Sequence, residues 1–125
     1  MELKEYQEKA MTTCMSSSNN FGYMFLNLVG EVGEFASKVA KHIRKGKLSI
    51  NDNVLCGKWG VSNNSESHIE ELKKEAGDIL WQLSGLCTVM GWSLEDVAQT
   101  NLDKLAARKA IGTIDGNGDG IVRDK

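Results

Sequence analysis

Residues 23–44 read YMFLNLVGEVGEFASKVAKHIR, and this stretch decides the fold class. Its apolar side chains recur three and four positions apart, which is the spacing of an amphipathic helix and not of a strand. At about 100° per residue, with Val32 as the origin, one apolar stripe lies within about 60° of that residue. The stripe comprises Phe25, Leu28, Val29, Ala36, Val39 and Ile43. We expect this stripe to face the core.

The same helical spacing extends along most of the chain, and proline is absent. It predicts four helices, at about residues 3–15, 23–44, 66–90 and, after the cap residue Ser93, 94–110. Residues 47–65 show no sustained period, which predicts a long loop of the kind that often forms a functional lid. Residues 111–125 form a glycine-rich tail. The predicted fold class is all-α, in one domain spanning residues 1–125.

Charge and composition narrow the classes of partner. The formal net charge is -2 and the sequence pI is about 5.7, so no overall positive field favours a nucleic-acid polymer. No apolar run is long enough to span a membrane, and the N-terminal residues lack a hydrophobic signal segment, so we expect a cytoplasmic chain without a membrane partner. The cysteines lie far apart, with only His42 and His68 as further soft ligands, so neither a disulfide nor zinc is expected.

Two pairs of carboxylates occupy equivalent places on the second and third predicted helices. Glu31 and Glu34 lie roughly 100° and 160° to one side of the first stripe. On the third helix the stripe comprises Ile69, Leu72, Ala76, Ile79, Leu80, Leu83 and Met90, and Glu75 and Asp78 repeat both offsets. If the helices pack antiparallel with their stripes facing, all four carboxylates converge. Four negative charges this close repel one another, so the arrangement requires a divalent cation among them. Carboxylate oxygens suit Mg²⁺ or Mn²⁺.

The context of these pairs distinguishes them from a solvated helix face. Glu2, Glu5 and Glu8 show the same spacing, and we assign no site there. Each of the two pairs, however, encloses an apolar residue and a glycine, Gly33 or Gly77. A glycine inside a helix costs about 1 kcal/mol relative to alanine. Glycines at equivalent positions therefore suggest close backbone approach or access for a ligand.

The Glu31-x-x-Glu34 and Glu75-x-x-Asp78 pairs resemble the hallmark of the MazG-like nucleotide pyrophosphohydrolases. This all-α superfamily includes dimeric dUTPases, dCTP pyrophosphatases and phosphoribosyl-ATP pyrophosphohydrolase. The resemblance implies that the four residues hold Mg²⁺ and that water attacks the α-phosphorus, giving a nucleoside monophosphate and pyrophosphate. It also implies a homodimer or a dimer of dimers. We expect Glu34 to be the general base and the role to be cleaning of the nucleotide pool.

Two other functions stay open at this point. One is phosphoribosyl-ATP pyrophosphohydrolase activity, which would need a different substrate pocket. The other is a non-catalytic helical binding module. The segment Asp115–Gly120 matches the first half of an EF-hand calcium loop, but the required glutamate would fall beyond Lys125. The segment looks more like the Gly-x-Gly-Asp tail followed by an arginine in phage and bacterial MazG-like proteins.

Several further residues are candidates for substrate binding. Lys38 lies one turn beyond Glu34, where it could bind phosphate or pair with a glutamate. Asn101, Lys104 and Arg108 share one face of the fourth helix and resemble the Asn-x-x-Lys-Leu and downstream arginine of the family. Nucleobase pockets use aromatic rings and amide edges. This predicts base contacts from Tyr6, Gln7, Asn27 and Trp59.

Overall fold

The structure is a computed structural model, and it describes residues 1–57 and 65–112, with the side chains of residues 65–67 left out. Four helices dominate it: α1 (Leu3–Met11), α2 (Phe21–Arg44), α3 (Ser65–Val89) and α4 (Leu94–Ala110). A 3-10 turn (Ser16–Ser18) precedes α2, and two short strands, β1 (Leu48–Asn51) and β2 (Val54–Gly57), lie between α2 and α3. The predicted all-α class is confirmed.

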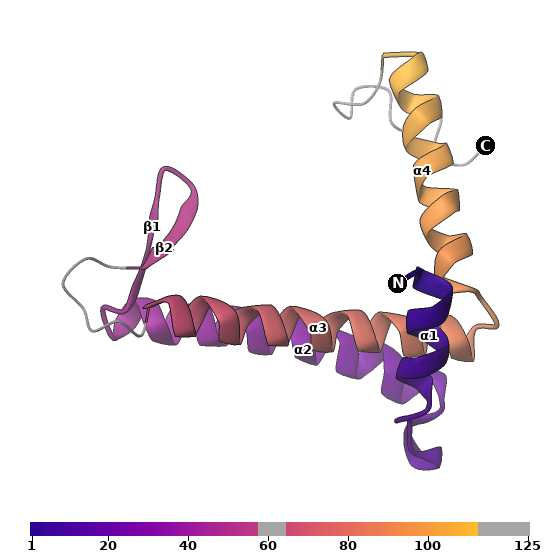
Figure 1. Ribbon diagram of the computed structural model, residues 1–125, viewed down its shortest axis with the longest axis horizontal. Helices are drawn as coiled ribbons and strands as arrows, with labels where there is room; N and C mark the ends of the chain where they lie inside the picture. Colours follow the sequence, from indigo (N-terminus) through magenta and orange to yellow (C-terminus); the bar gives the residue numbers. More distant parts are fainter. Residues whose placement is uncertain (58–64, 113–125) are drawn as a thin grey trace.

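The two long helices, α2 and α3, lie side by side along the length of the molecule (Figure 1). Their contacts run in reverse order, from Asn27 against Gln82 to His42 against Glu71, so the pair is antiparallel. At one end of the pair α1 packs against α3, and α4 starts beside α1 and points away from the long helices. The β-hairpin projects from the other end.

Short polar contacts set the helix boundaries. Asn20 caps α2 by accepting a hydrogen bond from the backbone N–H of Tyr23 at 2.8 Å, and Ser93 caps α4 by accepting one from Asp96 at 3.3 Å. The first helix ends at Met11, earlier than the predicted Met15. There the hydroxyls of Thr12 and Thr13 donate to carbonyl oxygens of the last turn, at 2.6 and 2.7 Å. Such local bonds favour termination over further helix.

The prediction of a loop throughout residues 47–65 was wrong, because part of it is a β-hairpin. Strands β1 and β2 pair antiparallel, with Asn51 opposite Val54. The two residues between them, Asp52 and Asn53, both have positive φ, at 51° and 64°. Positive φ at both central positions matches the type I′ turn of tight hairpins, and Asp and Asn tolerate it well. The turn chemistry was visible in the sequence, but the strands are too short to give a sustained period.

The predicted core stripes do not face each other, and this corrects the packing expectation. On α2 the face against α3 instead carries Met24, Glu31, Phe35, Lys38 and His42, about a quarter turn from the predicted stripe. Val29 is 59 % exposed and Val32 50 %, whereas Leu28 and Val39 are half-buried. On α3 the rotation is similar: Leu72 is buried and Ile79 and Leu83 are half-buried, while Ile69, Leu80 and Met90 stay exposed. Periodicity shows which side of a helix is apolar but not what covers it.

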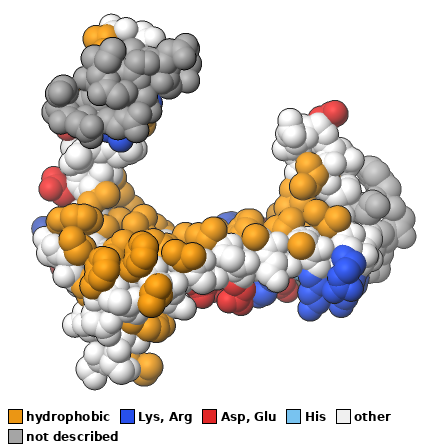
Figure 2. Space-filling view, turned by 180° about the vertical axis from the view of Figure 1, so that it is seen from behind, with side chains coloured by type: hydrophobic (Ala, Val, Ile, Leu, Met, Phe, Trp, Pro, Cys, Tyr) orange, Lys and Arg blue, Asp and Glu red, His pale blue; other side chains and the backbone are white. Residues whose placement is uncertain are grey.

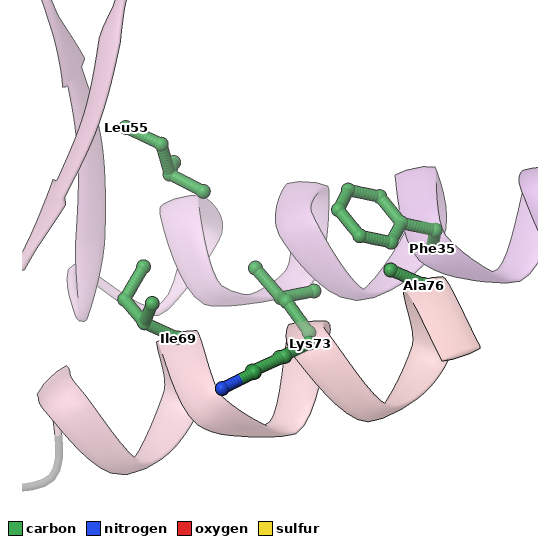
Figure 3. Close-up of a pocket in the computed structure, with 6 residues that line it drawn as sticks. Phe35, Leu55, Ile69, Lys73 and Ala76 are labelled. Carbon is green, nitrogen blue, oxygen red and sulfur yellow. The ribbon is translucent and has the colours of Figure 1, made fainter. Parts of the chain in front are cut away.

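This rotation leaves an apolar face on the long helices, defined by Phe25, Val29, Val32, Ile43, Ile69 and Leu80. Figure 2 shows hydrophobic side chains gathered along the molecule on one side, with acidic side chains along one edge. The face contains a hollow of about 350 Å³ between β2 and the long helices, lined by Phe35, Leu55, Ile69, Leu72, Lys73 and Ala76 (Figure 3). An exposed apolar surface of this extent is typical of an interaction site.

Among the described residues few side chains are buried, and the fully buried ones lie near the ends of the long helices. Met24 and Cys87 are buried where α1, α3 and α4 meet, together with Leu94, and Leu48 of β1 is buried at the other end. Cys14, Cys56 and Cys87 are all free thiols. Among the described residues, no helix is both long enough and apolar enough to cross a membrane.

Candidate functional site

The centre of the α2/α3 pair carries a carboxylate cluster, which we define as Glu31, Glu34, Glu75 and Asp78. Glu75 is only 7 % exposed, and the Lys38 ammonium donates a hydrogen bond to its Oε1 at 2.6 Å. The same ammonium lies 3.9 Å from Oε1 of Glu34. Lys38 therefore joins both acidic pairs by ionic contacts. A buried carboxylate needs such a partner, because leaving its charge unpaired would be costly.

The ionisation of the cluster shows that its members interact. Burial raises the pKa of Glu31, and the charges of Asp78, Glu34 and Glu75 raise it further. The pKa of Asp78 is also raised, first by burial and then by its hydrogen bond with Glu75. In contrast, the hydrogen bond from Lys38 lowers the pKa of Glu75. The two pKa values shift in opposite directions, so Asp78 takes up a proton more readily than Glu75 does. The structure brings together all four carboxylates that the sequence analysis selected.

Tyr6 of α1 lies beside this cluster. Desolvation raises the pKa of its hydroxyl, and the negative charge of Asp78 raises it further. The sequence analysis selected Tyr6 only as an aromatic residue for the base. Its place next to Asp78 follows from the packing of α1 on α3, which helical periodicity does not reveal.

A second polar contact between α2 and α3 continues the site toward α1. Asn27 donates from its amide to Oε1 of Gln82 at 2.6 Å, and to the Tyr23 hydroxyl at 3.3 Å. Gln82 is 3 % exposed, and the sequence analysis missed it. The signal was its position seven residues after Glu75, which places both on one face of α3.

The two glycines between the acidic residues do not meet backbone. A Cβ atom built at Gly33 or Gly77 would have no neighbour within 4 Å among the described residues. Of the two explanations suggested by the sequence, close backbone approach therefore does not apply within this chain. Open space beside the carboxylates is compatible with access for a ligand.

Comparison with known proteins gives a family match. Residues 20–111, which include the whole of α2, α3 and α4, match the model of the MazG nucleotide pyrophosphohydrolase domain. The chain belongs to the MazG nucleotide pyrophosphohydrolase family. It is also 35 % identical over 103 residues to the Gene 37 protein of Mycobacterium phage L5, which covers 82 % of this chain and 78 % of the phage protein. No solved structure gives a significant match.

Within residues 1–57 and 65–112, the other predicted substrate residues are not gathered at the carboxylate cluster. Asn101, Lys104 and Arg108 lie on α4, which points away from the long helices (Figure 1). Gln7 uses its amide to join α1 to the turn before α4: it donates to Thr88 Oγ1 and the Trp92 carbonyl, both at 3.0 Å, and accepts from the Leu94 N–H at 2.8 Å. Trp59 and the tail segment 113–125 lie outside the described residues.

The donor set suits the divalent metal on which MazG-family enzymes typically depend. The four carboxylates are hard oxygen ligands, and Lys38 is the cation that contacts two of them. Burial is the first cause of the raised pKa values of Glu31 and Asp78, and the negative charges of neighbouring carboxylates raise both further. A bound cation would relieve this repulsion. Carboxylate oxygens are the ligands that Mg²⁺ and Mn²⁺ prefer.

Proposed function

We propose that this chain hydrolyses nucleoside or deoxynucleoside triphosphates to the monophosphate and pyrophosphate, with Mg²⁺ as cofactor and Mn²⁺ as a substitute. The observation that carries the proposal is the carboxylate cluster, in which the buried Glu75 is coupled to three further acidic groups and paired with Lys38. Membership of the MazG family supports the same reaction class. Such an activity would remove unwanted triphosphates from the nucleotide pool.

Each residue of the cluster has a role in this proposal. Glu31, Glu34, Glu75 and Asp78 would hold the metal. When bound, the metal would neutralise phosphate charge and lower the pKa of water. The Glu34 side chain is 53 % exposed, more open than Glu75, so its carboxylate can reach a water and accept its proton. Lys38 would exchange its contact with a glutamate for one with a phosphate oxygen, which keeps its charge paired throughout.

The nucleoside would lie toward α1. Tyr6 and Asn27 supply polar groups there, next to Asp78 and Gln82 respectively. Trp59 stays a candidate for stacking on the base. We do not include Gln7, because its amide already forms the hydrogen bonds that join α1 to the start of α4.

We further propose that a second copy of the chain covers the apolar face. Phe25, Val29 and Val32 are exposed on α2, and α4 turns away from them (Figures 1 and 2). Pairing two α2/α3 hairpins through this face would form a four-helix bundle, the expected homodimer or part of a dimer of dimers. Asn101, Lys104 and Arg108 would then reach the triphosphate from the partner's α4.

The test is incubation of the purified chain with a panel of ribo- and deoxyribonucleoside triphosphates, in Mg²⁺, in Mn²⁺ and in chelator, with products separated by ion exchange. We expect monophosphate and pyrophosphate only with metal. Replacement Glu34→Gln should lower kcat by about 10² to 10⁴. Glu70→Gln is the matched control, because Glu70 is an exposed carboxylate elsewhere on α3. Turnover in chelator, or full activity of Glu34→Gln, would refute the proposal.

A further inference from the structure

A second group of potential metal ligands lies where α2 ends and α3 begins. It consists of His42 on α2 and of His68 and Glu71 on α3. Nε2 of His42 is 3.4 Å from Oε1 of Glu71, and the two imidazole ring centroids are 4.0 Å apart. One ligand atom from each residue lies within 4.8 Å of the other two. A single ion placed among them could contact all three after small side-chain adjustments.

Each histidine has one buried ring nitrogen that forms no hydrogen bond with the described residues. His42 is 7 % exposed, and its Nδ1 has no hydrogen-bond partner among the described residues. Nε2 of His68 is also buried, with no hydrogen-bond partner in that part of the chain. Each ring nitrogen of an imidazole is either a donor or an acceptor, so leaving one unmatched in the interior costs free energy. A metal ion is a partner that would accept a nitrogen lone pair.

The surroundings of His68 favour its neutral imidazole, which is the form that binds metals. The pKa of His68 is lowered, first by desolvation and then by the positive charges of His42 and Lys47, whereas Glu71 acts in the opposite direction. Two imidazolium ions with rings this close would repel. Glu71 supplies one negative charge, which offsets the nearby Lys47 and attracts a cation.

We propose that His42, His68 and Glu71 bind one first-row transition-metal ion of the Zn²⁺ type, at a site separate from the carboxylate cluster. Two imidazole nitrogens and one carboxylate are a common ligand set for Zn²⁺ and related ions, and a fourth position remains for water. Mg²⁺ prefers an all-oxygen set and would take the carboxylates instead. Zinc was not expected from the sequence, where the cysteines lie far apart and only His42 and His68 were counted beside them. The overlooked signal was His68 three residues before Glu71 on one helix.

Such an ion would tie the ends of α2 and α3 together beside the β-hairpin. His42 follows Lys38 by one turn, and Glu71 precedes Glu75 by one turn, so the proposed site lies about 6 Å along the helices from the Lys38–Glu75 pair. The Glu75 hydrogen bond is the first cause of the raised pKa of Lys38, and the negative charge of Glu71 raises it further. The proposed ion would therefore fix the helix separation next to the buried Lys38–Glu75 pair.

The experiment measures binding of Zn²⁺ to the purified full chain by titration calorimetry in excess Mg²⁺, which keeps the carboxylate cluster occupied. We expect one Zn²⁺ per chain and a higher Tm with Zn²⁺ than without it. His68→Asn and Glu71→Gln should each weaken binding by more than the roughly 10- to 100-fold that loss of an outer partner costs. Both side chains are partly or largely exposed, so the variants should fold, which circular dichroism checks.

Two controls separate this site from other places on the chain. Glu70→Gln, and the double variant Glu31→Gln with Asp78→Asn, should keep full Zn²⁺ affinity. Co²⁺ in place of Zn²⁺ should give visible ligand-field absorption without the sulfur charge-transfer band that Cys14 or Cys56 would produce. Failure of the wild-type chain to bind one Zn²⁺ in excess Mg²⁺ would overturn the proposal. So would unchanged affinity in His68→Asn and Glu71→Gln. Either result would leave the proposed hydrolysis untouched, since that depends on the carboxylate cluster.

Discussion

At the scale of single residues, Lys38 and Glu75 form a charged hydrogen bond between α2 and α3. The 2.6 Å hydrogen bond holds a carboxylate that has little contact with water. The contact stabilises the fold, and we propose that it also keeps Lys38 beside the triphosphate. Stability and activity should therefore respond differently to substitutions at these two positions.

We expect Lys38→Met to lower the free energy of unfolding at pH 7. The pKa of Glu75 is depressed in the folded chain, so this pair stabilises above the ordinary value of 4.5 and its contribution is lost as pH falls through the folded pKa. The difference between variant and wild type should therefore shrink below about pH 4.5. Urea unfolding across that range tests it, with exposed Lys41→Met as control. A pH-independent difference would show that packing of the lysine stem, and not its charge, is responsible.

Asp78→Asn should have the opposite effect on stability in chelator. Burial and Glu75 raise the pKa of Asp78 in the folded chain, so its ionised form carries a penalty above that pKa, which disappears as pH falls through it. Asparagine removes the penalty and can still donate to Glu75. We expect a higher Tm at neutral pH in chelator, together with at least about a hundredfold lower kcat. A lower Tm would mean that the carboxylates do not repel one another as described.

At the scale of the helix pair, Gly77 and Gly85 of α3 differ in the space available for a side chain. A Cβ atom on Gly85 would overlap the sulfur and terminal methyl of Met24, whereas Gly77 faces open space. Met24 is fully buried, so it has little room to move. The close approach between α2 and α3 therefore occurs near α1, away from the carboxylate cluster.

Gly85→Ala should destabilise the chain by about 1–3 kcal/mol through overpacking. Gly77→Ala should instead stabilise it by about 0.5–1 kcal/mol, because alanine is the better helix former. Urea unfolding of the two variants measures the contrast. If the space at Gly77 admits substrate, Gly77→Ala should also raise KM. Equal stability changes in both variants would argue against the described packing of Met24 on Gly85.

At the scale of the whole molecule, contacts among the described residues leave the apolar face exposed. The described parts of α1, α4 and the hairpin leave Val29 59 % and Val32 50 % exposed. In a two-fold dimer each substitution appears twice at the interface. A charge placed on this face should weaken association strongly, and it should change the stability of the single chain little.

We expect the wild-type chain to be at least a dimer and Val32→Glu to weaken association by about a hundredfold or more, because two unpaired charges would be buried. Sedimentation velocity over a concentration series measures this. Ser37→Glu is the matched control, since Ser37 is exposed on α2 outside the stripe. A monomeric wild-type chain, or a Val32→Glu variant that associates as tightly, would exclude this face as the dimer interface.

The sequence by itself determined the helices, most of their ends and the four carboxylates, because periodicity, caps and glycine stops act within a few residues. The tertiary structure decided which face of each long helix packs against the other. It placed the charged face of α2 against α3, buried Glu75 beside Lys38, and brought His42 to His68 and Glu71. These contacts join residues far apart in the chain. The rotation of each helix about its own axis depends on which apolar surface packs against another element. No local pattern carries that information.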